Sequence, residues 1–185
     1  MTTIVAALVV VSFASLAGLA LGVSGGEAFS ITDTEARDNA FAFEDARSFY
    51  AAALADCAAD AAYASWGCAP TDSFCGYFEA NLPEYFENAT ERLNANATHV
   101  IGYLLGDVSC KEVTSDETGA AYAVSAALGV NASSANVRKS GSVSRAYETD
   151  ASLSEYVFRT TVRDGETAVA EYAVQCPTPS PTPRP

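Results

Sequence analysis

The chain has 185 residues, 49% of them hydrophobic, and its 23 acidic against 10 basic residues give a formal net charge of −13. An acidic surface repels nucleic-acid phosphates, so this composition argues against a nucleic-acid-binding protein and predicts no nucleic-acid partner. Once the two terminal segments are set aside, about 150 residues remain, which is enough to bury one hydrophobic core.

The first predicted element is an uncharged apolar run from Ile4 to Val23, with the sequence IVAALVVVSFASLAGLALGV. As a helix, these roughly 20 residues span about 30 Å, which matches the hydrocarbon core of a bilayer. Its two serines, Ser12 and Ser15, can hydrogen-bond back to their own helix. We therefore predict a transmembrane anchor over residues 1–24, with the membrane as a partner through residues 4–23.

A cleaved signal peptide is the alternative interpretation of the same run. A signal peptide begins with basic residues, whereas the first basic residue of this chain is Arg37. The small-residue cleavage candidates, Gly18-Leu19-Ala20 and Ala20-Leu21-Gly22, fit the expected pattern loosely. The anchor is therefore preferred over a chain that is released after cleavage.

The chain contains five cysteines, and no two of them have Cys-x-x-Cys spacing. The single histidine, His99, has no cysteine near it in the sequence, so a Cys/His zinc site is not supported and no metal is predicted. Disulfides outside the cytoplasm are the better interpretation, with one thiol left over if two bridges form. The disulfide candidates are Cys57, Cys68, Cys75, Cys110 and Cys176.

The pairing of these cysteines stays open at this point. A local bridge within residues 57–75 is plausible, and Cys110 and Cys176, which bracket the predicted sheet, are compatible with a second bridge. Asn-x-Ser/Thr tripeptides add glycosylation candidates at Asn88, Asn96 and Asn131. Cysteines and tripeptides together predict a single-pass protein of the cell membrane with the bulk of the chain outside the cytoplasm.

A long amphipathic helix is predicted within residues 25–67. Glycines at 25 and 26 loosen the backbone, and the capping-box pattern Thr32-Asp33-Thr34-Glu35 places the helix start at Thr32. No proline or glycine follows before Trp66, so the helix has about 33 residues and a length of about 50 Å. A stripe of apolar residues at helical spacing is expected to face the core. The stripe is Phe43, Ala46, Tyr50, Ala53, Cys57, Ala61 and Ala64, widened by Phe41, Phe49, Leu54 and Tyr63.

Residues 68–106 are predicted to form a cysteine-containing loop and short helices. Pro83 suits the first turn of a helix that runs to about Asn94. The side chains of Tyr85, Phe86 and Leu93 are its expected buried residues. The apolar stretch from His99 to Gly106 fits a short helix or a first strand, and its pattern does not separate the two.

Residues 107–176 are predicted to form an antiparallel sheet of four or five strands. Apolar residues alternate from Tyr122 to Val130, as in a half-buried strand. Two further strands flank Asp164-Gly165, a turn signal of β-hairpins. Residues 110–114 and 137–147 are weaker strand candidates. The Pro/Thr-rich tail at 177–185 is predicted to form extended polyproline II outside the core.

The sequence contains no constellation that predicts catalysis. His99 is the only imidazole, and no glycine-rich phosphate loop is present, since the glycines at 22–26 follow an apolar span and not a strand. Asp56 and Asp60, four residues apart on one helix face, suit a hard cation in principle, but a solvated acidic face is the preferred interpretation. We therefore predict a non-enzymatic protein without catalytic residues, cofactor or metal.

In layout, the chain resembles type IV pilin-like proteins, including the pilin-related surface proteins of archaea. The residues that carry the resemblance are the apolar run Ile4–Val23, the long helix Thr32–Trp66 and the strand region that ends at Cys176. The resemblance implies apolar N-terminal helices in the membrane or bundled in a filament, with the sheet outside. It also implies that copies of the chain, or other pilin-like subunits, are its partners.

The predicted fold class is therefore α+β, with an N-terminal apolar span and a long amphipathic helix packed on a C-terminal antiparallel sheet. The predicted role is that of a membrane-anchored extracytoplasmic structural or pilin-like surface protein. A secreted, glycosylated binding module released by signal-peptide cleavage is the alternative.

Overall fold

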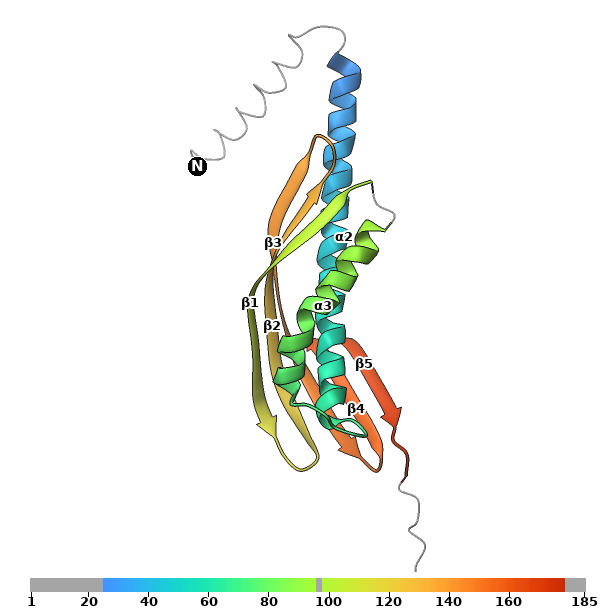
Figure 1. Ribbon diagram of the computed structural model, residues 1–185, viewed down its shortest axis with the longest axis vertical. Helices are drawn as coiled ribbons and strands as arrows, with labels where there is room; N and C mark the ends of the chain where they lie inside the picture. The colour runs from blue at the N-terminus through green and yellow to red at the C-terminus, as the bar shows by residue number, and fades with distance from the viewer. Residues whose placement is uncertain (1–24, 96–97, 179–185) are drawn as a thin grey trace, which may run out of the picture.

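Two helices pack on one face of a five-stranded antiparallel sheet, so the α+β class is confirmed (Figure 1). The computed structural model describes residues 25–95 and 98–178. The predicted anchor at Ile4–Val23 lies outside these residues. Within them, no helix is both long and apolar enough to cross a bilayer. The elements are α2 (Gly25–Trp66), α3 (Phe74–Asn94), β1 (Val100–Ser115), β2 (Gly119–Ser133), β3 (Arg138–Ser154), β4 (Val157–Asp164) and β5 (Thr167–Gln175).

The strands follow one another in the sheet in chain order, each antiparallel to its neighbour. Strand β2 lies between β1 and β3 and pairs with both along almost its whole length. In contrast, β4 pairs only with the last part of β3, from Glu148 to Ser154. The predicted hairpin turn is present between β4 and β5, where Gly165 has a positive φ of 60°.

The sheet begins at Val100, before the expected boundary at residue 107. The ambiguous stretch His99–Gly106 is therefore mostly strand, because it pairs with the end of β2: Ile101 lies opposite Ala132. The alternation predicted for β2 is confirmed, since every second residue from Ala120 to Ala132 is buried.

The start predicted for the long helix is wrong. α2 begins at Gly25, so Thr32 and Glu35 lie inside it instead of forming a capping box. The Ser/Thr-x-x-Glu pattern also fits a helix interior, and glycine costs a helix only about 1 kcal/mol per residue. The Glu35 carboxylate instead accepts hydrogen bonds from the Asn136 side-chain amide, at 3.3 and 3.4 Å.

The predicted start of the second helix at Pro83 is also wrong. α3 begins at Phe74, after Ser73, whose hydroxyl accepts a hydrogen bond from the Gly76 amide at 3.2 Å. Pro83 lies inside the helix, and Leu82 before it is fully buried. Burial of this helix against α2 and β1 outweighs the local cost of the proline.

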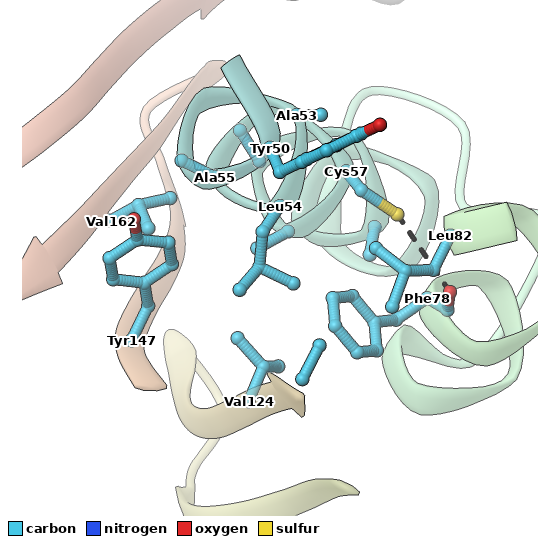
Figure 2. Packing of buried hydrophobic residues seen from close by; sticks show 14 of the residues in the cluster. Tyr50, Ala53, Leu54, Ala55, Cys57, Phe78, Leu82, Val124, Tyr147 and Val162 are labelled. Atoms are coloured by element: carbon cyan, nitrogen blue, oxygen red, sulfur yellow. Dashed lines mark hydrogen bonds between the residues drawn. The ribbon is translucent and has the colours of Figure 1, made fainter. Parts of the chain in front are cut away.

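The core lies between the sheet and the two helices. Figure 2 shows Leu54 of α2, Phe78 of α3 and Val124 of β2 converging on it. Polar contacts tie the helix to the sheet at both ends of this core: the Trp66 indole N–H donates to the Tyr122 hydroxyl at 3.0 Å. At the other end, the buried Asn39 amide donates to the Val137 carbonyl at 2.8 Å.

The two disulfides link the helical part of the chain to the strand part, and neither is one of the two bridges considered plausible from the sequence. Cys68 bonds to Cys176 and Cys75 bonds to Cys110, which leaves Cys57 free and buried. Sequence spacing favoured a local bridge within residues 57–75, but Cys57 faces the core inside α2. The expectation of two bridges and one leftover thiol is confirmed.

Candidate functional site

The predicted stripe of α2 divides into two sides. Most of the stripe is buried against the sheet or α3, as is Leu54. Three of the four widening residues are instead exposed: Phe41 by 63%, Phe49 by 45% and Tyr63 by 41%. The prediction that these three side chains face the core is wrong, because the sheet and α3 already cover the other side of the helix.

The exposed aromatic side chains lie on one line of the helix surface together with four aspartates. At about 100° per residue, these residues fall within one arc of about 100° on the α2 cylinder. We call this arc the outer face of α2. Its residues are Asp38, Phe41, Asp45, Phe49, Ala52, Asp56, Asp60 and Tyr63.

Three hollows follow the outer face along its length. The first, of about 330 Å³, lies between Asp38, Phe41 and Asp45 of α2 and the end of α3 with the start of β1. The second, of about 250 Å³, lies between Phe49, Ala52 and Asp56 and the α3 side chains. The third, of about 230 Å³, lies between Asp60 and Tyr63 and the strands β4 and β5.

These hollows are open and small. Ligand pockets usually measure about 300–1,000 Å³ and enclose most of the ligand. Two of the three hollows fall below that range, and all three belong to one elongated surface. Their size and arrangement suit the side chains of a docked chain segment better than a small molecule.

Two tyrosines hydrogen-bond to the aspartates in the C-terminal third of the outer face. The Tyr85 hydroxyl of α3 donates a short hydrogen bond to Asp60, and the Tyr172 hydroxyl of β5 donates to Asp56 at 3.2 Å. Burial and the adjacent Asp60 raise the pKa of Tyr85 above its usual value, and burial and Asp56 raise that of Tyr172. Both tyrosines therefore stay protonated donors at neutral pH.

The other predicted site residues lie away from this arrangement or at its edge. His99 is half-buried at the start of β1, where its Nδ1 lies 3.0 Å from the Thr98 hydroxyl, and it lines the first hollow. Within residues 25–95 and 98–178, no three His, Cys, Asp or Glu side chains are grouped to hold a metal ion.

The glycosylation candidates occupy different settings. Asn88 is exposed on α3 and lines the second hollow, whereas Asn131 is half-buried in β2. Asn96 lies outside the described residues. Because Asn88 borders the outer face, a glycan attached there would stand beside the second hollow. All three remain predictions.

The buried thiol of Cys57 lies on the inner side of α2. Figure 2 shows it pointing towards Phe78, whose carbonyl oxygen accepts from its Sγ at 3.7 Å. Burial, with Asp60 and Asp56 on the same helix, raises its pKa from 9.0 to about 12. A thiol in this setting is a poor nucleophile, so we assign it to packing.

Sequence reasoning missed the outer face because it treated all bulky apolar residues of the helix as core. The signal was present: Asp38, Asp45 and Asp56 recur within the same arc as Phe41 and Phe49, and charged residues do not share a core-facing arc.

Comparison with protein-family models, curated proteins and solved structures finds no match for this chain.

Proposed function

We propose that the chain is a non-enzymatic, membrane-anchored, extracytoplasmic structural protein of pilin-like type. The observation that carries this proposal is the pair of disulfides that tie both helices to the sheet. Protein disulfides persist in oxidising compartments, which supports placing residues 25–178 outside the cytoplasm. The apolar run Ile4–Val23 supports attachment to the membrane.

The layout of the described residues also supports a structural role. α2 contains 42 residues and lies along the sheet for most of its length (Figure 1). The outer face of this helix presents aromatic side chains and a row of hollows to the surroundings. Exposed apolar surface of this kind is typical of contacts between proteins, so the outer face supports a role in contact with another protein.

Fractionation of native cells tests the placement. We expect the protein in the membrane fraction, with residues 4–23 present in its intact mass. Four of the five cysteines should resist alkylation until a reductant is added. Recovery from the cytosol with all thiols reduced would contradict the proposal.

The alternative function, a secreted glycosylated binding module, predicts a different result in the same experiment. In that case the mature chain begins near residues 21–29 and is recovered free of the membrane. Electron microscopy of the membrane fraction then separates a filament subunit from a protein that stands alone on the surface.

A further inference from the structure

We propose that the outer face of α2 binds a basic amphipathic helix that belongs to a different protein. The surface is linear: from Asp38 to Tyr63 the helix rises by about 38 Å, or about seven turns. The first two hollows lie on the α3 side of α2, and the third lies on the β5 side. A rod that crosses α2 obliquely from the end of α3 towards β5 meets all three hollows.

A helix fits this path better than a strand does. Helices cross one another obliquely when the side-chain ridges of one enter the grooves of the other. The β5 edge could accept a strand, but β5 runs beside only the third hollow. Apolar side chains of a docked helix that project at three- and four-residue spacing can enter successive hollows.

Aromatic residues supply the apolar part of the contact. Phe41 and Phe49 are two turns apart on the outer face, and each is about half or more exposed. Aromatic side chains dominate the binding energy of many interfaces because each buries a large area with few rotatable bonds. Their exposure, on a helix whose other large apolar residues Phe43, Tyr50 and Leu54 are buried, indicates that they serve a contact with another molecule.

The charge of the outer face determines which kind of partner helix it can bind. The outer face carries four aspartates and no basic residue of α2, and Arg92 of α3 is the one arginine lining the three hollows. An apolar helix without charges, such as the run Ile4–Val23, would bury these carboxylates and offer them no positive charge. Lysines or arginines beside the apolar residues of the partner instead pair with them.

A second copy of the chain is a poorer occupant. Two outer faces placed against each other bring four aspartates opposite four aspartates, and the net charge of −13 opposes the approach of any two copies. The basic residues of the strands are partly engaged within the chain. The Lys139 ammonium lies over the Phe43 ring, and Arg163 pairs with Asp150.

A peptide-binding experiment tests the chemistry of the site. The full chain is reconstituted in nanodiscs of zwitterionic lipid, and fluorescence anisotropy reports the binding of an amphipathic Leu/Lys helix of about 18 residues. A Leu/Glu helix of the same pattern and empty nanodiscs are the controls. We expect the Leu/Lys helix to bind, with an affinity that falls as salt is raised, and the Leu/Glu helix not to bind.

Matched variants locate the binding. Phe41→Ser with Phe49→Ser should weaken binding about tenfold or more, because it removes two aromatic anchors. The control pair Leu104→Ser with Val113→Ser removes two exposed apolar residues of β1 and should leave the affinity within about twofold. Because the substituted side chains are exposed, we expect all variants to fold, and circular dichroism checks this.

Charge variants complete the test. Asp38→Asn with Asp45→Asn should weaken binding and reduce its salt dependence, whereas Glu148→Gln with Glu166→Gln, which changes the net charge equally, should not. Equal effects of both pairs would mean that the peptide only follows the net charge, and this would overturn the proposal. Self-association that the Phe41/Phe49 variant abolishes, without peptide binding, would assign the face to a second copy and overturn it as well.

Cross-linking in native cells tests the natural partner. A photoreactive amino acid at position 41 should capture a helical segment of another protein with apolar and basic residues on one side, identified by mass spectrometry. The same amino acid at position 113 is the control. Capture at position 41 of an acidic segment, or of residues 4–23, would contradict the proposal. Neither outcome bears on the membrane anchorage, which the fractionation experiment tests separately.

Discussion

The inner and outer sides of α2 place their large apolar side chains in opposite settings, one buried and one exposed. The inner side buries many small residues, with Ala46, Ala58, Ala61 and Ala62 fully buried around the larger Tyr50 and Leu54, whereas the outer side exposes Phe41 and Phe49. Small residues let the helix backbone approach the sheet and α3 closely, so the inner side serves packing. Large apolar side chains that are exposed to solvent provide apolar surface that another molecule can bury, so the outer side serves contact with another molecule.

The largest effect that this division predicts is on the rate at which Cys57, on the inner side, is alkylated. Its raised pKa lowers the thiolate fraction near neutral pH by about a thousandfold, and burial blocks access in addition. Alkylation by iodoacetamide should therefore be slowed by more than about a thousandfold in the native chain compared with the chain in denaturant, as measured by mass spectrometry without reductant. Rapid native labelling would show that the inner side is open.

The same thiol contributes to the pH dependence of stability. Its pKa in the folded protein, about 12, lies above its usual value of 9.0, so the folded state holds the proton more tightly. This contribution is fully present below about pH 9 and is lost as the pH rises towards about 12. Cys57→Ala should show a smaller loss of stability over that interval, measured by urea unfolding.

Removal of a disulfide should have the next largest effect, a loss in the free energy of unfolding. It also tests how far the packing of the inner side holds the fold without covalent links. Replacing Cys68 and Cys176 by serine opens a loop of roughly 100 residues, for which chain entropy predicts about 4.7 kcal/mol. Replacing Cys75 and Cys110 opens a loop of about 35 residues and should cost about 3.8 kcal/mol. Urea unfolding of the two variants tests this order, and equal stabilities would contradict it.

A pair of substitutions on α2 compares its two sides directly. Leu54→Ala on the inner side should lower the free energy of unfolding by about 2–5 kcal/mol, because it leaves a cavity in the core. Phe49→Ala on the outer side should change it by about 0.5 kcal/mol or less. A large loss of stability for Phe49→Ala would mean that the outer face belongs to the core of the chain after all.

On the inner side, the loss of a single hydroxyl should have a smaller effect than the loss of the Leu54 side chain. The Tyr50 hydroxyl lies 2.8 Å from that of Thr90 in α3. Tyr50→Phe should lower the free energy of unfolding by about 0.5–1.5 kcal/mol, the usual net contribution of one hydrogen bond. Thr90→Val should have a similar effect, and the double variant should cost less than the sum of the two.

The sheet could be predicted from the sequence far better than the helix boundaries. Alternating burial in β2 and the turn at Gly165 are local patterns that a strand and a tight turn require. The starts of α2 and α3 were missed because tertiary packing decided them: α3 runs through Pro83, and α2 begins at Gly25. Cysteine pairing depends on three-dimensional proximity, which spacing in the sequence does not encode.

Only part of the candidate site could be predicted from the sequence. Asp56 and Asp60 were recognised as neighbours on one helix face, but hydrophobicity alone could not show that Phe41 and Phe49 share that exposed side. Which side of an amphipathic helix is covered depends on the elements packed against it, here α3 and the sheet.

The bridge between Cys68 and Cys176 gives the molecule a short route for tension. The bridge joins the chain just beyond α2 to the chain just after β5, and Figure 1 shows the first turn of α2 at the opposite end of the molecule from this point. A pull applied between Gly25 and Cys176 therefore runs along one helix and one covalent bond. This covalent path bypasses residues 69–175, which include every strand of the sheet.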